Sequence, residues 1–313
     1  MKIASILILL GTMFGYFLNA HAGVSKSLKY SDSPRNADEI ARQVYFVNHF
    51  YAFSTFSVAQ HPKGVAILIN TAPDSPDRVL QIERHVNNTF NDGIVKSKEI
   101  AIIRDGKDKS TGMLIVDYED NRPHDHFVWL PQLRKIKRFS QPANEESWAG
   151  SHFTYGDMTL RKPEDEVHRI IGASVFNQCL DSLPAYRSKN SDISAYLPAG
   201  SCAPKGKAVY QLESTNKNPD WWYDYRVSLV DTTSYADYRT EYYKDGKLIK
   251  IIDRDWRSMG MKDPRAQYWN YWYTRDLRNS HESEIIVPRV AMKYNHDHDN
   301  TFWSLKTLRQ LRR

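Results

Sequence analysis

From residue 94 onward, the sequence consists largely of short β-prone runs separated by tight-turn signals. Turns such as Asp105-Gly106 and Asp245-Gly246 follow these runs directly, and strands joined by such turns pair antiparallel. Helical patterns do not alternate with the runs, which excludes a parallel βαβ architecture. One large antiparallel sheet is therefore predicted. Its expected strands span Ser97–Arg104, Gly112–Tyr118, Asp125–Leu130, Ala208–Glu213, Trp222–Val230, Tyr235–Lys244, Lys247–Asp253, Tyr268–Tyr273 and Ser283–Val287.

Helical patterns occur before and after this series of strands. Asn36 and Glu39 have the spacing of a capping box, and apolar residues follow them at helical spacing. Val79, Ile82 and Val86 also recur at helical spacing. The predicted helices span residues 36–50, 77–90 and 303–311. Helices flanking one antiparallel sheet define an α+β fold, which we expect to be a curved sheet with helices against a single face.

The first residues resemble an export signal. Lys2 supplies a positive charge, Ile3–Leu18 is almost wholly apolar, and Ala20-His21-Ala22 matches a cleavage site. The apolar run is shorter than the roughly 20 residues that a membrane-spanning helix requires. We therefore expect a signal peptide over residues 1–22, cleaved after Ala22, and a periplasmic protein of one domain over residues 23–313. An uncleaved membrane anchor is the alternative.

The composition favours contact with amphipathic or anionic partners. The chain carries a formal net charge of +6, with 19 Tyr and 8 Trp. Aromatic side chains of this kind combine an apolar face with a polar group, which suits grooves for amphipathic ligands. The mildly basic charge is compatible with anionic lipid headgroups or an acidic partner, and equally with an ordinary solvated surface.

The two cysteines, Cys179 and Cys202, flank a polar segment rich in Pro and Ser. In the oxidising periplasm this arrangement predicts one disulfide, worth about 3–4 kcal/mol in the chain-entropy description. A metal pair or a redox pair is the alternative, but both lack the C-x-x-C spacing and nearby histidines.

Histidines and acids suggest two metal sites that the sequence leaves incomplete. His124 and His126 would share one face of a strand, and His296 and His298 alternate with acids. Neither group has a third and fourth ligand at a recognised spacing. A His-rich polar turn is therefore the preferred interpretation.

Motifs for nucleophilic or phosphate chemistry are missing from the sequence. Gly150-Ser151-His152, with Asp157 nearby, suggests a catalytic triad, but adjacent side chains on an extended backbone point apart. There is no G-x-S-x-G, P-loop or dinucleotide-binding motif. We therefore expect neither an enzyme nor a cofactor.

A basic segment lies beside two aromatic residues, Trp129 and Phe139. Its cations are Arg134, Lys135, Lys137 and Arg138. Nucleic acid would suit such a pattern, but in an exported protein the polyanion would be a lipid headgroup or an acidic partner. We expect no nucleic-acid partner, and a solvated strand face remains the simpler alternative.

Two neighbouring segments carry a family resemblance. They are WLPQLRKIKR at residues 129–138 and WAGSHFTYGD at residues 148–157, which together resemble the hallmark of LolA-like outer membrane lipoprotein-sorting proteins. Further similarities lie at residues 112–114, 221–226, 236–240 and 303–309. The chain is longer than the compact LolA carrier and contains the additional Cys179–Cys202 segment, so it resembles a distant branch.

The resemblance implies a half-open antiparallel β-barrel, with helices packed on its concave face around an apolar cavity for acyl chains. It also implies a periplasmic carrier that sorts lipids or lipoproteins toward the outer membrane, often linked to RND-type inner-membrane transporters, with no catalytic residues. We expect the protein to be a monomer. A non-carrying accessory subunit of such a transporter is the alternative. The candidate cavity residues are Trp129, Leu133, Ile136, Phe139, Trp148, Phe153, Tyr155, Trp222 and Tyr225. The candidate headgroup or partner contacts are Arg134, Lys135, Lys137 and Arg138.

Overall fold

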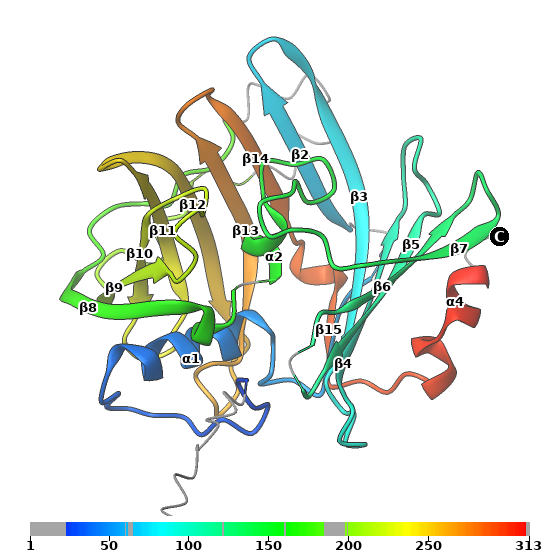
Figure 1. Ribbon diagram of the computed structural model, residues 1–313, viewed down its shortest axis with the longest axis horizontal. Helices are drawn as coiled ribbons and strands as arrows, with labels where there is room; N and C mark the ends of the chain where they lie inside the picture. Colours follow the sequence, from blue (N-terminus) through cyan, green and yellow to red (C-terminus); the bar gives the residue numbers. More distant parts are fainter. Residues whose placement is uncertain are drawn as a thin grey trace, which may run out of the picture.

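The computed structural model describes residues 23–310 except 60, 62–64, 121, 160, 185–197 and 199. The predicted signal peptide lies outside the described residues. An open, 15-stranded antiparallel sheet dominates the structure (Figure 1), with the strand order β7-β6-β5-β4-β3-β2-β14-β13-β12-β11-β10-β9-β8. Strand β1 pairs with β3 and β15 beside this path. The α+β fold class is confirmed.

The strands are β1 (Thr55–Val58), β2 (Ala66–Ala72), β3 (Ser75–Asn87), β4 (Val95–Ile103), β5 (Gly112–Tyr118), β6 (Asp125–Leu130), β7 (Lys135–Phe139), β8 (Glu166–Val175), β9 (Ala208–Asn216), β10 (Tyr225–Asp231), β11 (Asp237–Lys244), β12 (Lys247–Ser258), β13 (Gln267–Asp276), β14 (His281–Ile286) and β15 (Met292–Tyr294). The helices are α1 (Ala37–Asn48), α2 (Tyr155–Thr159) and α4 (Leu305–Gln310), with short 3₁₀ turns η1 (Pro163–Asp165), η3 (Arg289–Ala291) and η4 (Asn300–Trp303).

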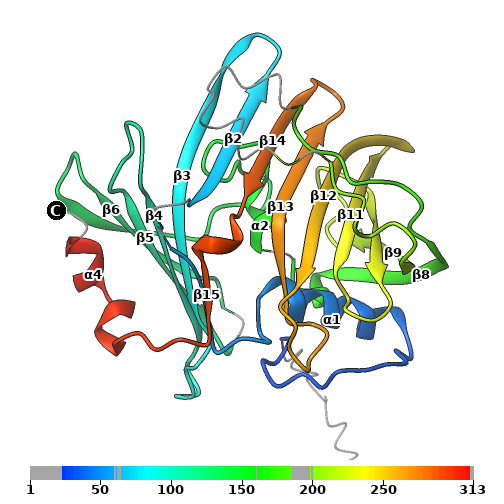
Figure 2. The same cartoon turned by 180° about the vertical axis from the view of Figure 1, so that it is seen from behind.

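The centre of the sheet joins strands that are far apart in the sequence. Leu68 of β2 lies opposite Ile285 of β14, so β2 and β14 connect an N-terminal half-sheet (β2–β7) to a C-terminal half-sheet (β8–β14). The sheet is strongly bent, and α2 lies between the two halves when the molecule is seen from either side (Figures 1 and 2). We call the face toward α2 the inner face and the opposite one the outer face.

Local signals placed several elements correctly. Asn36 caps α1 by accepting a hydrogen bond from the backbone N–H of Glu39 at 2.9 Å. Asp245 and Gly246 have φ values of 50° and 70°, which is the left-handed pair that a type I′ hairpin requires between β11 and β12. All nine expected strands are present, with shifted ends.

The helix predicted over residues 77–90 is wrong, because this segment forms the long strand β3. It pairs with β2 and β1 on one side and with β4 on the other. Successive side chains of a strand point to opposite faces, so Val79 and Ile82 lie on different faces of the sheet. Both faces of β3 are covered, and apolar residues therefore occur at either parity and imitate a helical spacing.

The helices cover both faces of the sheet. Helix α1 packs against β8 and β9, and its side chains share one apolar cluster with Trp256 and Trp269. Helix α4 lies on the other side, where Leu308 and Trp303 pack against Ile100 on the outer face of the N-terminal half-sheet (Figure 2). The C-terminal helix thus stabilises the outer face.

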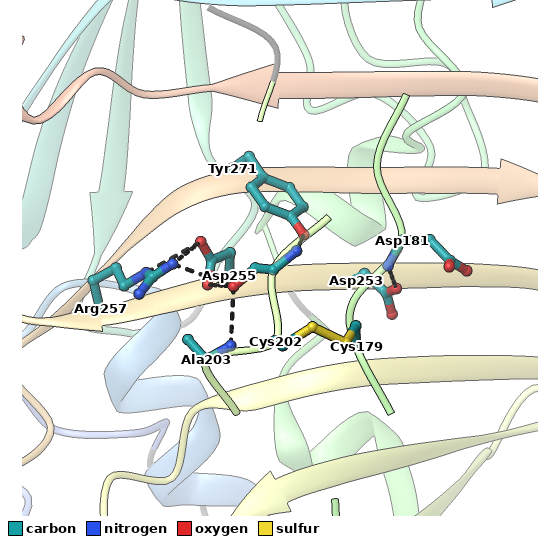
Figure 3. The surroundings of a disulfide bond; sticks show 9 residues. Cys179, Asp181, Cys202, Ala203, Asp253, Asp255, Arg257 and Tyr271 are labelled. Atoms are coloured by element: carbon teal, nitrogen blue, oxygen red, sulfur yellow. Dashed lines mark hydrogen bonds and ion pairs between the residues drawn. A yellow bond between two sulfur atoms is a disulfide. The ribbon is translucent and has the colours of Figure 1, made fainter. Parts of the chain in front are cut away.

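The predicted Cys179–Cys202 disulfide is confirmed. The segments at both cysteines lie across the outer face of the C-terminal half-sheet (Figure 3). The backbone N–H of Asp181 donates to Asp253 Oδ2 at 2.6 Å, and that of Ser201 donates to the Tyr271 hydroxyl at 3.1 Å. The disulfide therefore fastens a polar covering to this face.

Candidate ligand-binding pocket

An apolar pocket lies between the inner face of the N-terminal half-sheet and the segment that contains α2. The space that it encloses, counted together with its open mouth and the solvent there, is about 650 Å³. Its lining residues are Val58, Ala66, Leu68, Ile82, Arg84, Glu99, Ala101, Ile115, Trp148, Tyr155, Met158, Thr159, Trp269, Ile285 and Val287.

The sheet wall of this pocket follows from strand alternation. Ala101 and Ile115 of β4 and β5 face the pocket, whereas their neighbours Ile100 and Leu114 face the outer cluster around α4. Alanine at positions 66 and 101 leaves space where a larger aliphatic side chain would fill the pocket.

The opposite wall carries Trp148 and Tyr155. The Trp148 backbone N–H donates to Phe153 O at 2.9 Å, which closes a tight loop through Gly150 at φ 70°. The Tyr155 hydroxyl lies 2.6 Å from His126 Nε2, so the ring is anchored to β6. Burial, followed by the nearby His124, lowers the pKa of His126 to about 4, so its imidazole is neutral near pH 7.

One ion pair interrupts the apolar lining. Arg84 Nε and Nη2 donate to the two carboxylate oxygens of Glu99 at 2.8 and 2.9 Å. This bidentate pair leaves no net charge in the wall. It gives the pocket one polar site, which the polar group of an amphiphilic ligand would contact while its apolar chain packs on the rest of the lining.

Beyond α2, a group of buried charged side chains lies on the inner face of the C-terminal half-sheet. Asp157 accepts from Lys250 Nζ at 2.5 Å, and Glu166 accepts from Arg226 Nη2 at 2.5 Å and Arg161 Nε at 3.2 Å. All five side chains are buried. Burial by itself would raise the pKa of Glu166, but the two guanidinium groups lower it to about 2. We call these five residues the ionic cluster.

The structure brings two of the nine candidate cavity residues, Trp148 and Tyr155, to the pocket. Trp129 and Ile136 pack in the outer cluster with Trp303. The others are distributed elsewhere: Phe153 is fully buried against Trp272, Trp222 stacks on Tyr242 beside the ionic cluster, Tyr225 stacks on Tyr243, and Leu133 and Phe139 are exposed.

The four candidate headgroup contacts lie on β7 and on the turn before it. Arg138 donates to Asp125 Oδ1 at 2.6 Å, so its charge is already paired. Arg134, Lys135 and Lys137 are exposed.

The histidine and serine candidates are engaged in other contacts. His124 pairs with Asp117 at 3.0 Å, and His296 lies 2.7 Å from His298 between their Nε2 atoms. Ser151 Oγ donates its hydrogen bond to the Trp148 carbonyl at 2.6 Å, so the hydroxyl is not hydrogen-bonded to a histidine that could act as its general base. Within the described part of the chain, no group of three or more His, Cys, Asp or Glu side chains could hold a metal ion.

Sequence reasoning missed most of the aliphatic lining. Leu68, Ile82 and Ala101 carry no unusual chemistry, and their role depends on sharing a face with Ile285 across the β2–β14 junction. The available signal was in residues 99–103, where side chains that face the pocket alternate with side chains that face the outer cluster. The small side chain of Ala101 in this strand marks the place where the pocket has space.

Comparison with known proteins supports the fold. A protein-family model described as "Uncharacterized protein" matches residues 96–310. A search among curated proteins found no match. Among solved structures, a DUF1329 family protein from Desulfovibrio piger ATCC 29098 is 13% identical with a TM-score of 0.63, covering 88% of this chain and 100% of that chain.

Two further structures are similar over the same share of this chain. A candidate outer membrane lipoprotein-sorting protein domain from Vibrio parahaemolyticus is 15% identical with a TM-score of 0.62, and 88% of this chain and 100% of that chain are covered. A LolA superfamily protein from Nitrosomonas europaea is 14% identical with a TM-score of 0.51 over the same shares. In the described residues, we find no helix with the length and apolar character to cross a membrane.

Proposed function

We propose that this protein is a periplasmic carrier of lipids or lipoproteins. The chain belongs to the family whose model matches residues 96–310, and its fold is that of a distant LolA-like branch of the outer membrane lipoprotein-sorting proteins. The pocket between the N-terminal half-sheet and α2 would receive their acyl chains. The observation that carries this proposal is the pocket's apolar lining on the inner face of a bent, open sheet.

The physical chemistry of such binding requires no covalent step. Each methylene transferred from water into an apolar wall contributes about 0.8 kcal/mol, so ten methylenes would contribute about 8 kcal/mol before ordering costs. The lining is mostly aliphatic and aromatic, and the Arg84–Glu99 pair is internally neutralised. Release would follow when a membrane or partner offers the chain an equally apolar environment.

A substitution that fills the pocket tests the proposal. Ala101→Phe places a ring in the space facing Trp148, and we expect the uptake of a fluorescent fatty acid to weaken at least about tenfold, or 1.4 kcal/mol. Ala173→Phe on the exposed part of β8 is the matched control. Mass spectrometry of the protein purified from its host supplies the second measurement. Recovery without lipid, together with no uptake of the probe, would exclude a carrier.

An accessory subunit of an RND-type transporter is the second candidate. It is favoured by the ionic cluster, which puts buried charges on the inner face of the C-terminal half-sheet where a larger carrier cavity would need apolar walls. In that case Ala101→Phe would leave co-purification with the transporter and lipid transport unchanged. Loss of transport with intact co-purification would instead support the carrier.

A further inference from the structure

Two hairpin ends form a continuous basic surface at one end of the N-terminal half-sheet. They are the β4–β5 turn (residues 104–111) and the β6–β7 turn (residues 131–134), which lie side by side in both views (Figures 1 and 2). Gln132 Nε2 in the second turn donates to the Lys107 carbonyl in the first at 3.5 Å. We call these two turns, with Lys135, the basic end.

The basic end carries an excess of unneutralised cations. Lys107, Lys109, Arg134 and Lys135 are exposed, and in the described part of the chain none of the four forms an ion pair. Of the two acids in the β4–β5 turn, Asp108 pairs with Arg78 at 3.4 Å. Asp105 accepts the backbone N–H of Gly106 at 2.7 Å and remains the one unpaired acid of this turn. The surface is therefore complementary to a polyanion.

An apolar side chain projects from the same surface. Leu133 is 51% exposed at the tip of the β6–β7 turn. Its backbone N–H donates to Leu130 O at 3.1 Å, and Arg134 follows at φ 52°, so a tight turn holds this leucine outward. A protruding leucine surrounded by cations is the pattern of segments that enter the headgroup region of an anionic bilayer. The basic end exposes no aromatic side chain on which nucleobases could stack, which favours lipid over nucleic acid.

The basic end is physically connected to the pocket wall. Arg78 of β3 bridges the two, with Nη2 3.4 Å from Asp108 Oδ2 and Nη1 donating to Ala149 O at 3.4 Å. Ala149 directly follows Trp148, which lines the pocket. A surface held against the basic end would thus lie next to the loop that forms one side of the pocket.

We propose that the basic end is the membrane-docking surface of this protein. Lys107, Lys109, Arg134 and Lys135 contact anionic lipid headgroups, and Leu133 enters the interface. The biological role of this docking rests on the proposed lipid-carrier function. Docking would bring the Trp148 side of the pocket to the bilayer from which an acyl chain is taken or to which it is delivered.

Co-sedimentation with lipid vesicles tests the proposal. The full protein should bind phosphatidylcholine vesicles that contain phosphatidylglycerol, bind pure phosphatidylcholine vesicles weakly, and dissociate as salt is raised. Changing Lys107, Lys109, Arg134 and Lys135 to Glu should reduce binding at least about a hundredfold, since each cation contributes roughly 1 kcal/mol near such a surface. The charge-matched control changes the exposed Lys205, Lys207, Lys247 and Lys262 to Glu and should bind nearly as wild type.

The leucine is tested separately. Leu133→Ser should weaken binding several-fold, while Leu248→Ser, at a 37% exposed position of β12, should have little effect. Circular dichroism confirms that each variant is folded. Equal loss in the two charge-reversal variants, or binding of single-stranded RNA as tight as that of anionic vesicles, would overturn the proposal.

The pocket variant separates this inference from the proposed function. Ala101→Phe should dock on anionic vesicles as wild type does while losing fatty-acid uptake. If Ala101→Phe keeps its uptake, the pocket assignment fails, and docking through the basic end still stands on the vesicle data.

Discussion

On the inner face of the N-terminal half-sheet, Leu68, Ala101 and Ile115 border open space. Against the same face of the C-terminal half-sheet lies the ionic cluster, in which Asp157 of α2 pairs with Lys250 and all five charged side chains are buried. The short helix α2 separates the two environments. Its Tyr155 and Met158 face the pocket, while Asp157 joins the ionic cluster.

The difference shows how one bent sheet can combine a fixed half with an accessible half. A buried charge is tolerated only with its partner at close range, so the members of the ionic cluster cannot move aside for a ligand. Small apolar side chains need no such partner, and the space beside them can be filled by any apolar group. The sheet curvature alone therefore does not decide where a ligand enters.

The largest expected effect comes from breaking the ionic cluster. Asp157→Ala leaves the Lys250 ammonium buried without its counter-ion, and we expect a loss of about 3–5 kcal/mol in the free energy of unfolding. Urea denaturation measures this loss. The double variant Asp157→Ala with Lys250→Met should recover much of it, and a double variant as unstable as the single one would contradict the assignment.

A pH-dependent effect is expected on the outer face of the same half. Burial raises the pKa of Glu284 to about 8, and Oε2 of its carboxyl group accepts the backbone N–H of Leu183 at 3.1 Å. The folded state thus holds a proton that the unfolded state releases near pH 4.5. Stability should fall as pH rises from about 4.5 to 8, by at most about 5 kcal/mol for this group.

The substitution Glu284→Gln removes this titration. Thermal unfolding followed across that pH range should show a flatter profile for the variant than for the wild type. A slope unchanged by the substitution would show that Glu284 is charged in the folded protein.

The smallest effect is expected in the pocket wall. Arg84 and Glu99 form a bidentate pair at 2.8 and 2.9 Å, but their side chains remain 21% and 23% exposed. Glu99→Gln should therefore change the free energy of unfolding by less than about 1 kcal/mol in urea denaturation. A loss of stability as large as that of Asp157→Ala would mean that ion pairs contribute equally to the stability of the two half-sheets.

Much of the fold could be predicted because its signals are local. The cap of α1, the Asp245-Gly246 hairpin and the single cysteine pair each depend on residues close in sequence or on one possible pairing. The helix prediction over β3 failed because apolar residues on both faces of a covered strand carry no clear period. Strand β8 was missed because its apolar residues, such as Val167 and Val175, are exposed at the sheet edge rather than alternating with a buried face.

By itself, the sequence determined nine of the strands with the turns between them, the disulfide and the likeness to lipoprotein-sorting proteins. Only the tertiary structure decided which side chains of each strand face inward. Side chains alternate between the two faces of a strand, and this alternation in the sequence looks the same whichever face is the inner one. The pairing of β2 with β14 and the position of α2 made that choice. They placed Ala101 and Ile115 in the pocket and Trp129 beneath α4, although in the sequence the tryptophan was the more conspicuous residue.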